Sequence, residues 1–153
     1  MALHLGLDLG GTRLKAAAFD KEGRILARHT EPLTEPGSAP AQARTARNKL
    51  EKEYAAQAVS IGLAAPGMAA PDGSRIACLP GSKVGIEGFD WAAFFEDVAV
   101  IRVLNDAHAA LLGEAWQGAG RGLQEAVLVT LGTGVGGAIL NGGRLLRGHL
   151  GRA

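Results

Sequence analysis

The sequence predicts a mixed α/β fold, in which antiparallel strands come first and parallel strands separated by helices follow. Two observations support this prediction. Near the N-terminus, two short apolar segments flank a pair of glycines, which is typical of a β-hairpin. Further along, compact apolar runs alternate with stretches of helix-forming residues, which is typical of parallel strands joined by helices. The expected element order is β-β-β-α-β-α-β-α-β-β.

Three antiparallel strands are expected in the first thirty or so residues. Leu3–Leu9 has leucine at every odd position, and Arg13–Phe19 is apolar again after the two glycines. A third strand is expected at 24–29, because residues 20–23 (Asp-Lys-Glu-Gly) suit a tight turn. Residues 30–40 contain three prolines and a glycine and are predicted to form a loop.

Helices and buried strands are expected to alternate after this loop. Residues 41–58 are rich in Ala, Gln, Glu, Lys and Arg, which favours a helix. Compact apolar runs predict buried parallel strands at 59–65 and 98–104. Between them, residues 68–88 hold many glycines and prolines, with a short strand expected at 75–79 and a short capped helix at 90–97.

The last predicted elements are a helix and a second hairpin. Leucine, alanine and tryptophan recur at four-residue spacing in 107–117, as expected for a helix, and the glycines of 118–122 end it. Strands are expected at 126–131 and 135–140, joined by a tight turn at 132–134.

Composition and charge exclude several classes of protein. The net charge of +1 argues against a nucleic-acid partner, which a concentrated basic face would bind. Cys78 is the single cysteine and cannot form an internal disulfide. No apolar run reaches the roughly 18 residues that a membrane span needs, and no signal peptide is apparent. We therefore expect a cytoplasmic protein that binds small molecules and no membrane.

The first glycine turn has the chemistry of a phosphate site. Glycines allow backbone N–H groups to approach phosphate oxygens closely, because no Cβ intervenes. A carboxylate beside such a turn would repel a bare phosphate and is better suited to holding Mg²⁺. The candidate ligands are Asp8, Gly10, Gly11, Thr12 and Lys15.

The second glycine turn has a similar composition. Its candidate phosphate ligands are Gly132, Thr133 and Gly134, and more glycines follow it. Either turn alone is equally well explained as a hairpin without a ligand. Because strands flank both turns, neither fits the Walker A loop or the dinucleotide-binding fingerprint, in which the glycines precede a helix.

An acidic residue follows the strand predicted at 98–104. Asp106 stands at the start of a helix, where open α/β sheets place ligand-contacting groups. It is the best candidate for a base that orients or deprotonates an attacking hydroxyl. The alternative interpretation is a helix N-cap, a position that Asp often occupies. The neighbouring Asn105 can both donate hydrogen bonds to sugar hydroxyls and accept them.

Taken in order and at these separations, residues 8–12, 105–106 and 131–137 closely resemble the corresponding motifs of the ROK family. That family contains glucokinases, other hexose and N-acetylhexosamine kinases and sugar-responsive repressors. The resemblance implies the actin-like, ribonuclease-H-like fold, with residues 1–118 as a small lobe and 119–153 as the start of a large lobe that the sequence does not complete.

The resemblance also implies roles for individual residues. Both glycine turns would bind ATP phosphates together with Mg²⁺, Asp106 would be the catalytic base, and Asn105 would bind the sugar. Cys78 stands before a Leu-Pro pair where many relatives have a sugar-contacting Asn, so the preferred sugar stays open. No zinc site is expected, because the family's Cys-rich motif is absent.

Two further alternatives stay open at this stage. The chain is expected to be an ATP-dependent sugar kinase or a fragment of one that is inactive alone, and its partners would then be sugar, ATP and either a second copy or a complementing C-terminal lobe. The other alternative is a non-catalytic, sugar-responsive regulator or scaffold. ROK repressors carry a DNA-binding module before the first strand, whereas the first strand here begins at Leu3.

Overall fold

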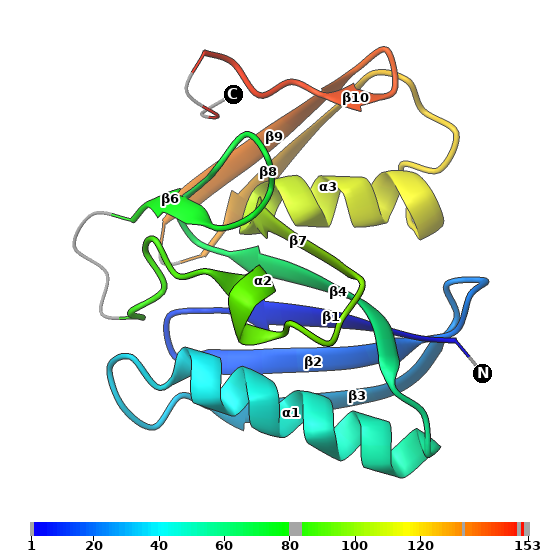
Figure 1. The fold of residues 1–153 in the computed structure, drawn as a ribbon. Helices are drawn as coiled ribbons and strands as arrows, with labels where there is room; N and C mark the ends of the chain where they lie inside the picture. Colours follow the sequence, from blue (N-terminus) through cyan, green and yellow to red (C-terminus); the bar gives the residue numbers. More distant parts are fainter. Residues whose placement is uncertain (1, 80–83, 133, 150, 152–153) are drawn as a thin grey trace.

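A five-stranded mixed sheet forms the centre of the chain (Figure 1). The computed structural model describes residues 2–79, 84–132, 134–149 and 151. The strand order is β3-β2-β1-β4-β7; β1, β2 and β3 are antiparallel, and β4 and β7 run parallel to β1. The strand bounds are Leu3–Leu9 for β1, Arg13–Phe19 for β2, Ile25–Pro32 for β3, Ala58–Ala65 for β4 and Val100–Asn105 for β7. The predicted fold class is confirmed.

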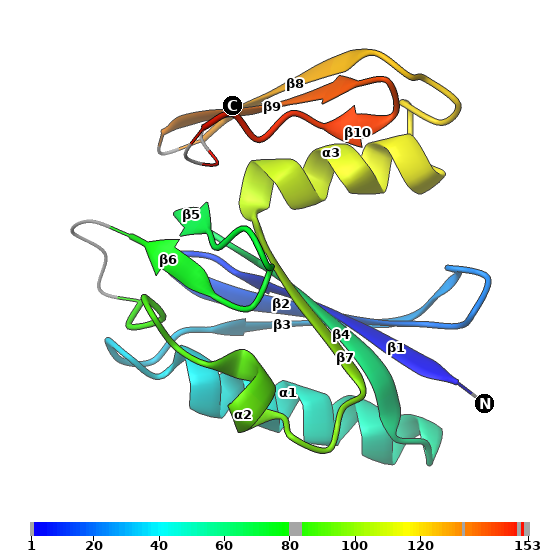
Figure 2. The same cartoon turned by 45° about the horizontal axis from the view of Figure 1, so that its top comes forward.

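Two helices cover one face of this sheet, and a third lies on the opposite side (Figures 1 and 2). Helices α1 (Ala39–Tyr54) and α2 (Trp91–Phe94) lie on the covered face, where alternate strand residues are buried. The core there is aliphatic and aromatic, and its large fully buried side chains include Leu7, Leu63, Val103 and Trp91. Helix α3 (Asp106–Gln117) lies between this sheet and a second one.

The second sheet has three strands in the order β10-β9-β8. Their bounds are Ala126–Leu131 for β8, Val135–Asn141 for β9 and Arg144–Leu145 for β10. One face packs on α3 through a cluster of four buried residues, Ala107, Leu111, Ala138 and Leu140. A separate two-stranded sheet joins β5 (Met68–Ala69) and β6 (Ile76–Cys78).

Several predicted boundaries were wrong by a few residues. The helix predicted at 41–58 spans Ala39–Tyr54, because a proline is tolerated in a first helical turn and Ala55 then adopts a left-handed φ of 47° that ends the helix. Part of the loop predicted at 30–40 is strand, since β3 pairs with β2 as far as Pro32. The short helix predicted at 90–97 is present with its cap, Asp90 accepting a hydrogen bond from the Ala93 N–H, but it ends at Phe94 and a turn follows.

One charged group ties α1 to the segment after α2. Arg47 is 8% exposed at its side chain and donates hydrogen bonds to Asp97 and Glu51. Its guanidinium carbon also lies 5.4 Å from the centre of the Phe95 ring. The Arg47 guanidinium holds the pKa of the Asp97 carboxyl below its usual range. No helix in the described part of the chain is long and apolar enough to cross a membrane.

Candidate functional site

The carboxyl ends of β1, β4 and β7 meet at one edge of the five-stranded sheet. The register pairs Asp8 with Ala64, and Ala64 with Leu104, so the three residues form a row across the sheet. Neighbouring strands lie about 4.8 Å apart, which puts β1 and β7 about 10 Å apart at this level. The candidate metal ligand at the end of β1 and the candidate base just after β7 therefore lie at the same edge of the sheet, with the end of β4 between them.

The first glycine turn leaves part of its backbone open to a ligand, at Gly11. The Gly10 N–H donates to the Arg13 carbonyl across the turn at 2.9 Å. A Cβ built on Gly11 would meet no atom within 4 Å, so the fold itself does not require a glycine there. The hydroxyl of exposed Thr12 forms no hydrogen bond with the described residues. These features fit a turn whose missing side chains serve a ligand.

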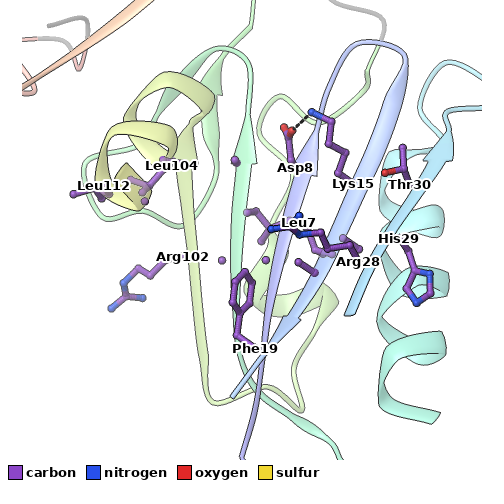
Figure 3. A pocket seen from close by; sticks show the side chains of 18 of the residues that line it. Leu7, Asp8, Lys15, Phe19, Arg28, His29, Thr30, Arg102, Leu104 and Leu112 are labelled. Carbon is purple, nitrogen blue, oxygen red and sulfur yellow. Dashed lines mark hydrogen bonds and ion pairs between the residues drawn. The ribbon is translucent and has the colours of Figure 1, made fainter. Parts of the chain in front are cut away.

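Asp8 and Lys15 are held together beside this turn. They are partners across β1 and β2, and the Lys15 Nζ lies 3.1 Å from the Asp8 Oδ2 (Figure 3). The two side chains are 41% and 65% exposed, so both remain accessible to a ligand. A cation and a carboxylate in contact can be separated by a ligand that offers each a better partner, such as a phosphate with its metal ion.

Asn105, and not Asp106, caps helix α3. The Asn105 Oδ1 accepts hydrogen bonds from the N–H groups of Ala107 and His108, at 2.9 and 3.3 Å. Its Nδ2 donates to the Gly67 carbonyl at 3.0 Å, which links the helix to the end of β4. The amide therefore has one N–H left for a substrate, and sequence reasoning had not identified its structural role.

Asp106 stands in the first turn of α3 with an exposed carboxylate. One of its oxygens, Oδ1, accepts a hydrogen bond from the Ala107 N–H at 2.8 Å. The other oxygen forms no hydrogen bond with the described residues. Since the Asn105 side chain already caps the helix, the Asp106 carboxylate has an oxygen available to accept a proton from a hydroxyl.

The second glycine turn approaches the same helix end. A Cβ built on Gly136 would lie 3.8 Å from the Ala107 Cβ, which puts the β8–β9 hairpin against the start of α3. At Gly132 and Gly134 a Cβ would meet no atom within 4 Å. Both glycine turns lie on the same side of the molecule in the two views (Figures 1 and 2). Thr133 lies outside the described residues.

The candidate ligands around Asp8 suit Mg²⁺ bound together with phosphate better than a metal ion bound by protein side chains alone. Among the described residues, no three His, Cys, Asp or Glu side chains gather closely enough to form a metal site. Mg²⁺ usually keeps several waters and binds through one or two carboxylates plus the phosphates of its substrate. A single accessible carboxylate such as Asp8, beside a glycine turn, fits that pattern.

Comparisons with known proteins identify the family of the chain. The model of the ROK family matches residues 4–153. The glucokinase of Streptomyces coelicolor is 33% identical over 154 residues, covering 100% of this chain and 48% of that protein. An N-acetylmannosamine kinase of Escherichia fergusonii is 34% identical over 151 residues, covering 97% of this chain and 51% of that protein. The chain thus spans about half the length of these curated relatives.

A solved structure gives the same result for the fold. The ROK family glucokinase of Streptomyces griseus, in complex with glucose and AMPPNP, superimposes with a TM-score of 0.84 at 30% identity. The superposition covers 99% of this chain and 48% of the glucokinase. With matching motifs, a family model spanning nearly every residue and a shared fold, the chain belongs to the ROK family.

Proposed function

We propose that this chain carries the phosphate-binding and part of the sugar-binding machinery of an ATP-dependent sugar kinase, which transfers a phosphoryl group to a hexose or an N-acetylhexosamine. The single observation that carries the proposal is the position of the exposed Asp106 carboxylate, at the sheet edge where β1 leads into the first glycine turn and at the helix end against which the β8–β9 hairpin packs. The names of the relatives, glucokinases and N-acetylmannosamine kinases, support the substrate class.

Each residue has a distinct task in the proposed reaction. The backbone N–H groups of the glycine turns that are not already bonded within the turns, as those of Gly10 and Gly132 are, hold the phosphates, and Lys15 contributes a positive charge. Asn105 orients the sugar with its remaining N–H, and Asp106 accepts the proton of the attacking hydroxyl. Mg²⁺, held by Asp8 and the phosphates, would neutralise the charge that develops during transfer. Catalysis of this kind depends mainly on positioning and on charge neutralisation.

Nucleotide binding is the first test, because it does not require a complete enzyme. Gly11→Val should weaken AMPPNP binding at least about tenfold, since the added side chain occupies the space reserved for phosphate. Lys15→Met should weaken it less, through loss of one charge. Isothermal titration calorimetry on the purified chain, with Mg²⁺ present, measures both effects. Equal AMPPNP binding by wild type and Gly11→Val would contradict the phosphate assignment.

Turnover is the second test and addresses Asp106. ATP consumption is measured with glucose and N-acetylmannosamine, using the chain alone and the chain mixed with the C-terminal half of the Streptomyces coelicolor glucokinase. Asp106→Asn should lower kcat about 10²- to 10⁴-fold while AMPPNP binding is unchanged. Glu96→Gln, at an exposed position on the other side of the sheet, is the matched control. Sugar binding without any turnover, by the chain alone or by the mixture, would favour the regulator alternative instead.

A further inference from the structure

The carbonyl that orients the Asn105 amide belongs to a tightly packed residue. Gly67 accepts the hydrogen bond from the Asn105 Nδ2 at 3.0 Å. It has a φ of +99°, and a Cβ built on it would lie 2.7 Å from the Cys78 carbonyl oxygen and 3.0 Å from the Leu79 Cδ1. The end of β6 therefore lies directly against the Gly67 backbone. A shift of the chain at 78–79 would move the carbonyl that Asn105 binds.

Strands β5 and β6 are too short to fix this position by themselves. The sheet that they form has two strands, of two and three residues. An isolated two-stranded hairpin is at best marginally stable in water. The pairing ends at Met68 and Cys78, so the N–H of the next residue, Leu79, has no partner in the ladder. A group outside the hairpin is needed to hold the end of β6.

Glu87 supplies this partner from the segment before α2. Its Oε2 accepts a hydrogen bond from the Leu79 N–H at 2.9 Å. The same segment runs parallel to β6, through a bridge between Ile76 and Glu87 and a hydrogen bond from the Gly88 N–H to the Ile76 carbonyl at 2.8 Å. Ile76 and Ile86 are fully buried, which anchors both segments in the core. The carboxylate is thus presented by a well-anchored backbone.

The Glu87 carboxylate has no other partner among the described residues. Its side chain is exposed, and it forms no ion pair with any residue that the structure describes. A hydrogen bond from an N–H to a carboxylate is stronger than one to a neutral acceptor. The one contact of this side chain therefore acts on the position of the Leu79 backbone.

We propose that Glu87 is a positioning residue of the candidate site, which fixes the end of β6 against Gly67 and thereby fixes the Asn105 amide. The effect passes from the carboxylate to the Leu79 N–H, from β6 to the Gly67 backbone, and from the Gly67 carbonyl to the amide. The Asn105 Oδ1 is already held by the start of α3, so the Gly67 carbonyl determines which N–H of the amide is left for a sugar hydroxyl. The link to the sugar rests on the proposed function, whereas the positioning of the amide does not.

The test compares two substitutions of similar size on the isotope-labelled chain. Glu87→Gln keeps an oxygen that can accept from the Leu79 N–H, whereas Glu87→Leu keeps none. NMR reports on both ends of the proposed connection, with Asn105→Asp used to assign the side-chain amide. Glu87→Leu should reduce the chemical-shift difference between the two Nδ2 protons of Asn105, because one of them loses its acceptor. It should also make the Leu79 amide exchange about tenfold faster. Glu87→Gln should keep both signals near their wild-type values.

Glu96→Leu is the matched control for loss of an exposed carboxylate. Glu96 forms no hydrogen bond with the described residues, so its replacement should change neither signal. Unchanged Asn105 resonances in Glu87→Leu would overturn the proposal. A response to Glu87→Gln as large as that to Glu87→Leu would also overturn it, because the hydrogen-bond acceptor would then not be what matters.

Titration of the same samples with glucose and N-acetylmannosamine tests the sugar role separately. A sugar that contacts Asn105 should shift its Nδ2 resonances in wild type and should bind at least about fivefold more weakly to Glu87→Leu than to Glu87→Gln. Equal affinity of the two variants would overturn the link between Glu87 and the sugar. Asn105 resonances that respond to Glu87→Leu but to neither sugar would contradict the proposed function and would support the positioning of the amide.

Discussion

The two sheets of the chain carry similar glycine turns but rest on very different amounts of buried structure. The five-stranded sheet shares a continuous core with α1 and α2. Among the described residues, the cluster between the three-stranded sheet and α3 has four buried members, two from each. The other face of this sheet is apolar and open to solvent, with Val127, Val129, Leu131 and Val135 between 62% and 82% exposed. The first glycine turn is therefore supported by the core of its own sheet. The second depends on the packing of its sheet against α3 and on any structure that covers the outer face of that sheet.

The largest expected effect contrasts one leucine from each sheet. Leu63→Ala should lower the free energy of unfolding of the whole chain by about 2–5 kcal/mol, because the residue is 2% exposed in a core that cannot easily collapse. Leu140→Ala should instead mainly lower the protection of the β8–β10 amides against hydrogen exchange, since the small cluster between this sheet and α3 can open locally. Urea denaturation and hydrogen exchange measure the two effects. Equal loss of protection in both sheets after Leu140→Ala would refute the contrast.

A glycine comparison sharpens the same contrast. Gly67 has a φ of +99°, and a Cβ there would lie 2.7 Å from the Cys78 carbonyl oxygen. Gly67→Ala should therefore lower the free energy of unfolding by about 1–3 kcal/mol. Gly132→Ala should leave it nearly unchanged, because its added Cβ would meet nothing within 4 Å. Thermal denaturation followed by circular dichroism compares them, and a marked loss of stability in Gly132→Ala would show that this turn is tightly packed.

Arg47→Met tests the support that α1 gives to the first sheet. The substitution removes the hydrogen bonds between the guanidinium and the carboxylates and should lower the free energy of unfolding by about 1–2 kcal/mol at neutral pH. The value is modest because Asp97 is 56% exposed and solvent screens its charge. The pKa of Asp97 is lowered by Arg47 in the fold, so the pair stabilises above the unfolded-state pKa of about 3.9 and stops doing so as pH falls through the folded-state pKa. In urea denaturation, the difference in the free energy of unfolding between wild type and variant should become smaller at low pH. A difference that does not depend on pH would contradict this assignment.

The smallest expected effect is on the open face of the second sheet. Val129→Thr should change the free energy of unfolding of the isolated chain by less than about 0.5 kcal/mol, because the valine is 62% exposed. Differential scanning calorimetry measures it. A substantial destabilisation would mean that this face is buried in solution, and the contrast between the two sheets would then disappear.

Much of the fold could be predicted because local patterns determine it. The odd-numbered leucines of β1 and the glycines between β1 and β2 specify a hairpin without reference to the rest of the chain. The C-terminal end of α1 could not be predicted, because residues 55–58 include good helix formers and a left-handed Ala55 leaves no signal in the sequence. Ala58 joins β4 through a pairing with Leu3, which is far away in the chain.

The candidate site was predictable as a set of residue types but not as an arrangement. Asn and Asp are equally good helix caps, so the sequence could not decide that Asn105 caps α3 and leaves Asp106 exposed. The hydrogen bond from Asn105 to Gly67 joins residues 38 positions apart and has no local signature. The face of the five-stranded sheet that α1 and α2 cover could not be predicted either, because alternation along a strand distinguishes two faces without saying which one a helix covers.

Helix α3 is attached to the first sheet at both of its ends. At its start, Asn105 bonds to the Gly67 carbonyl. At its other end, the Gln117 Nε2 donates to the Glu22 carbonyl, and Trp116 packs so closely over the β2–β3 turn that a Cβ on Gly23 would clash with its ring. Because both ends of α3 are held to the first sheet, we expect Asp106 to keep its position relative to Asp8 when the second sheet moves against α3.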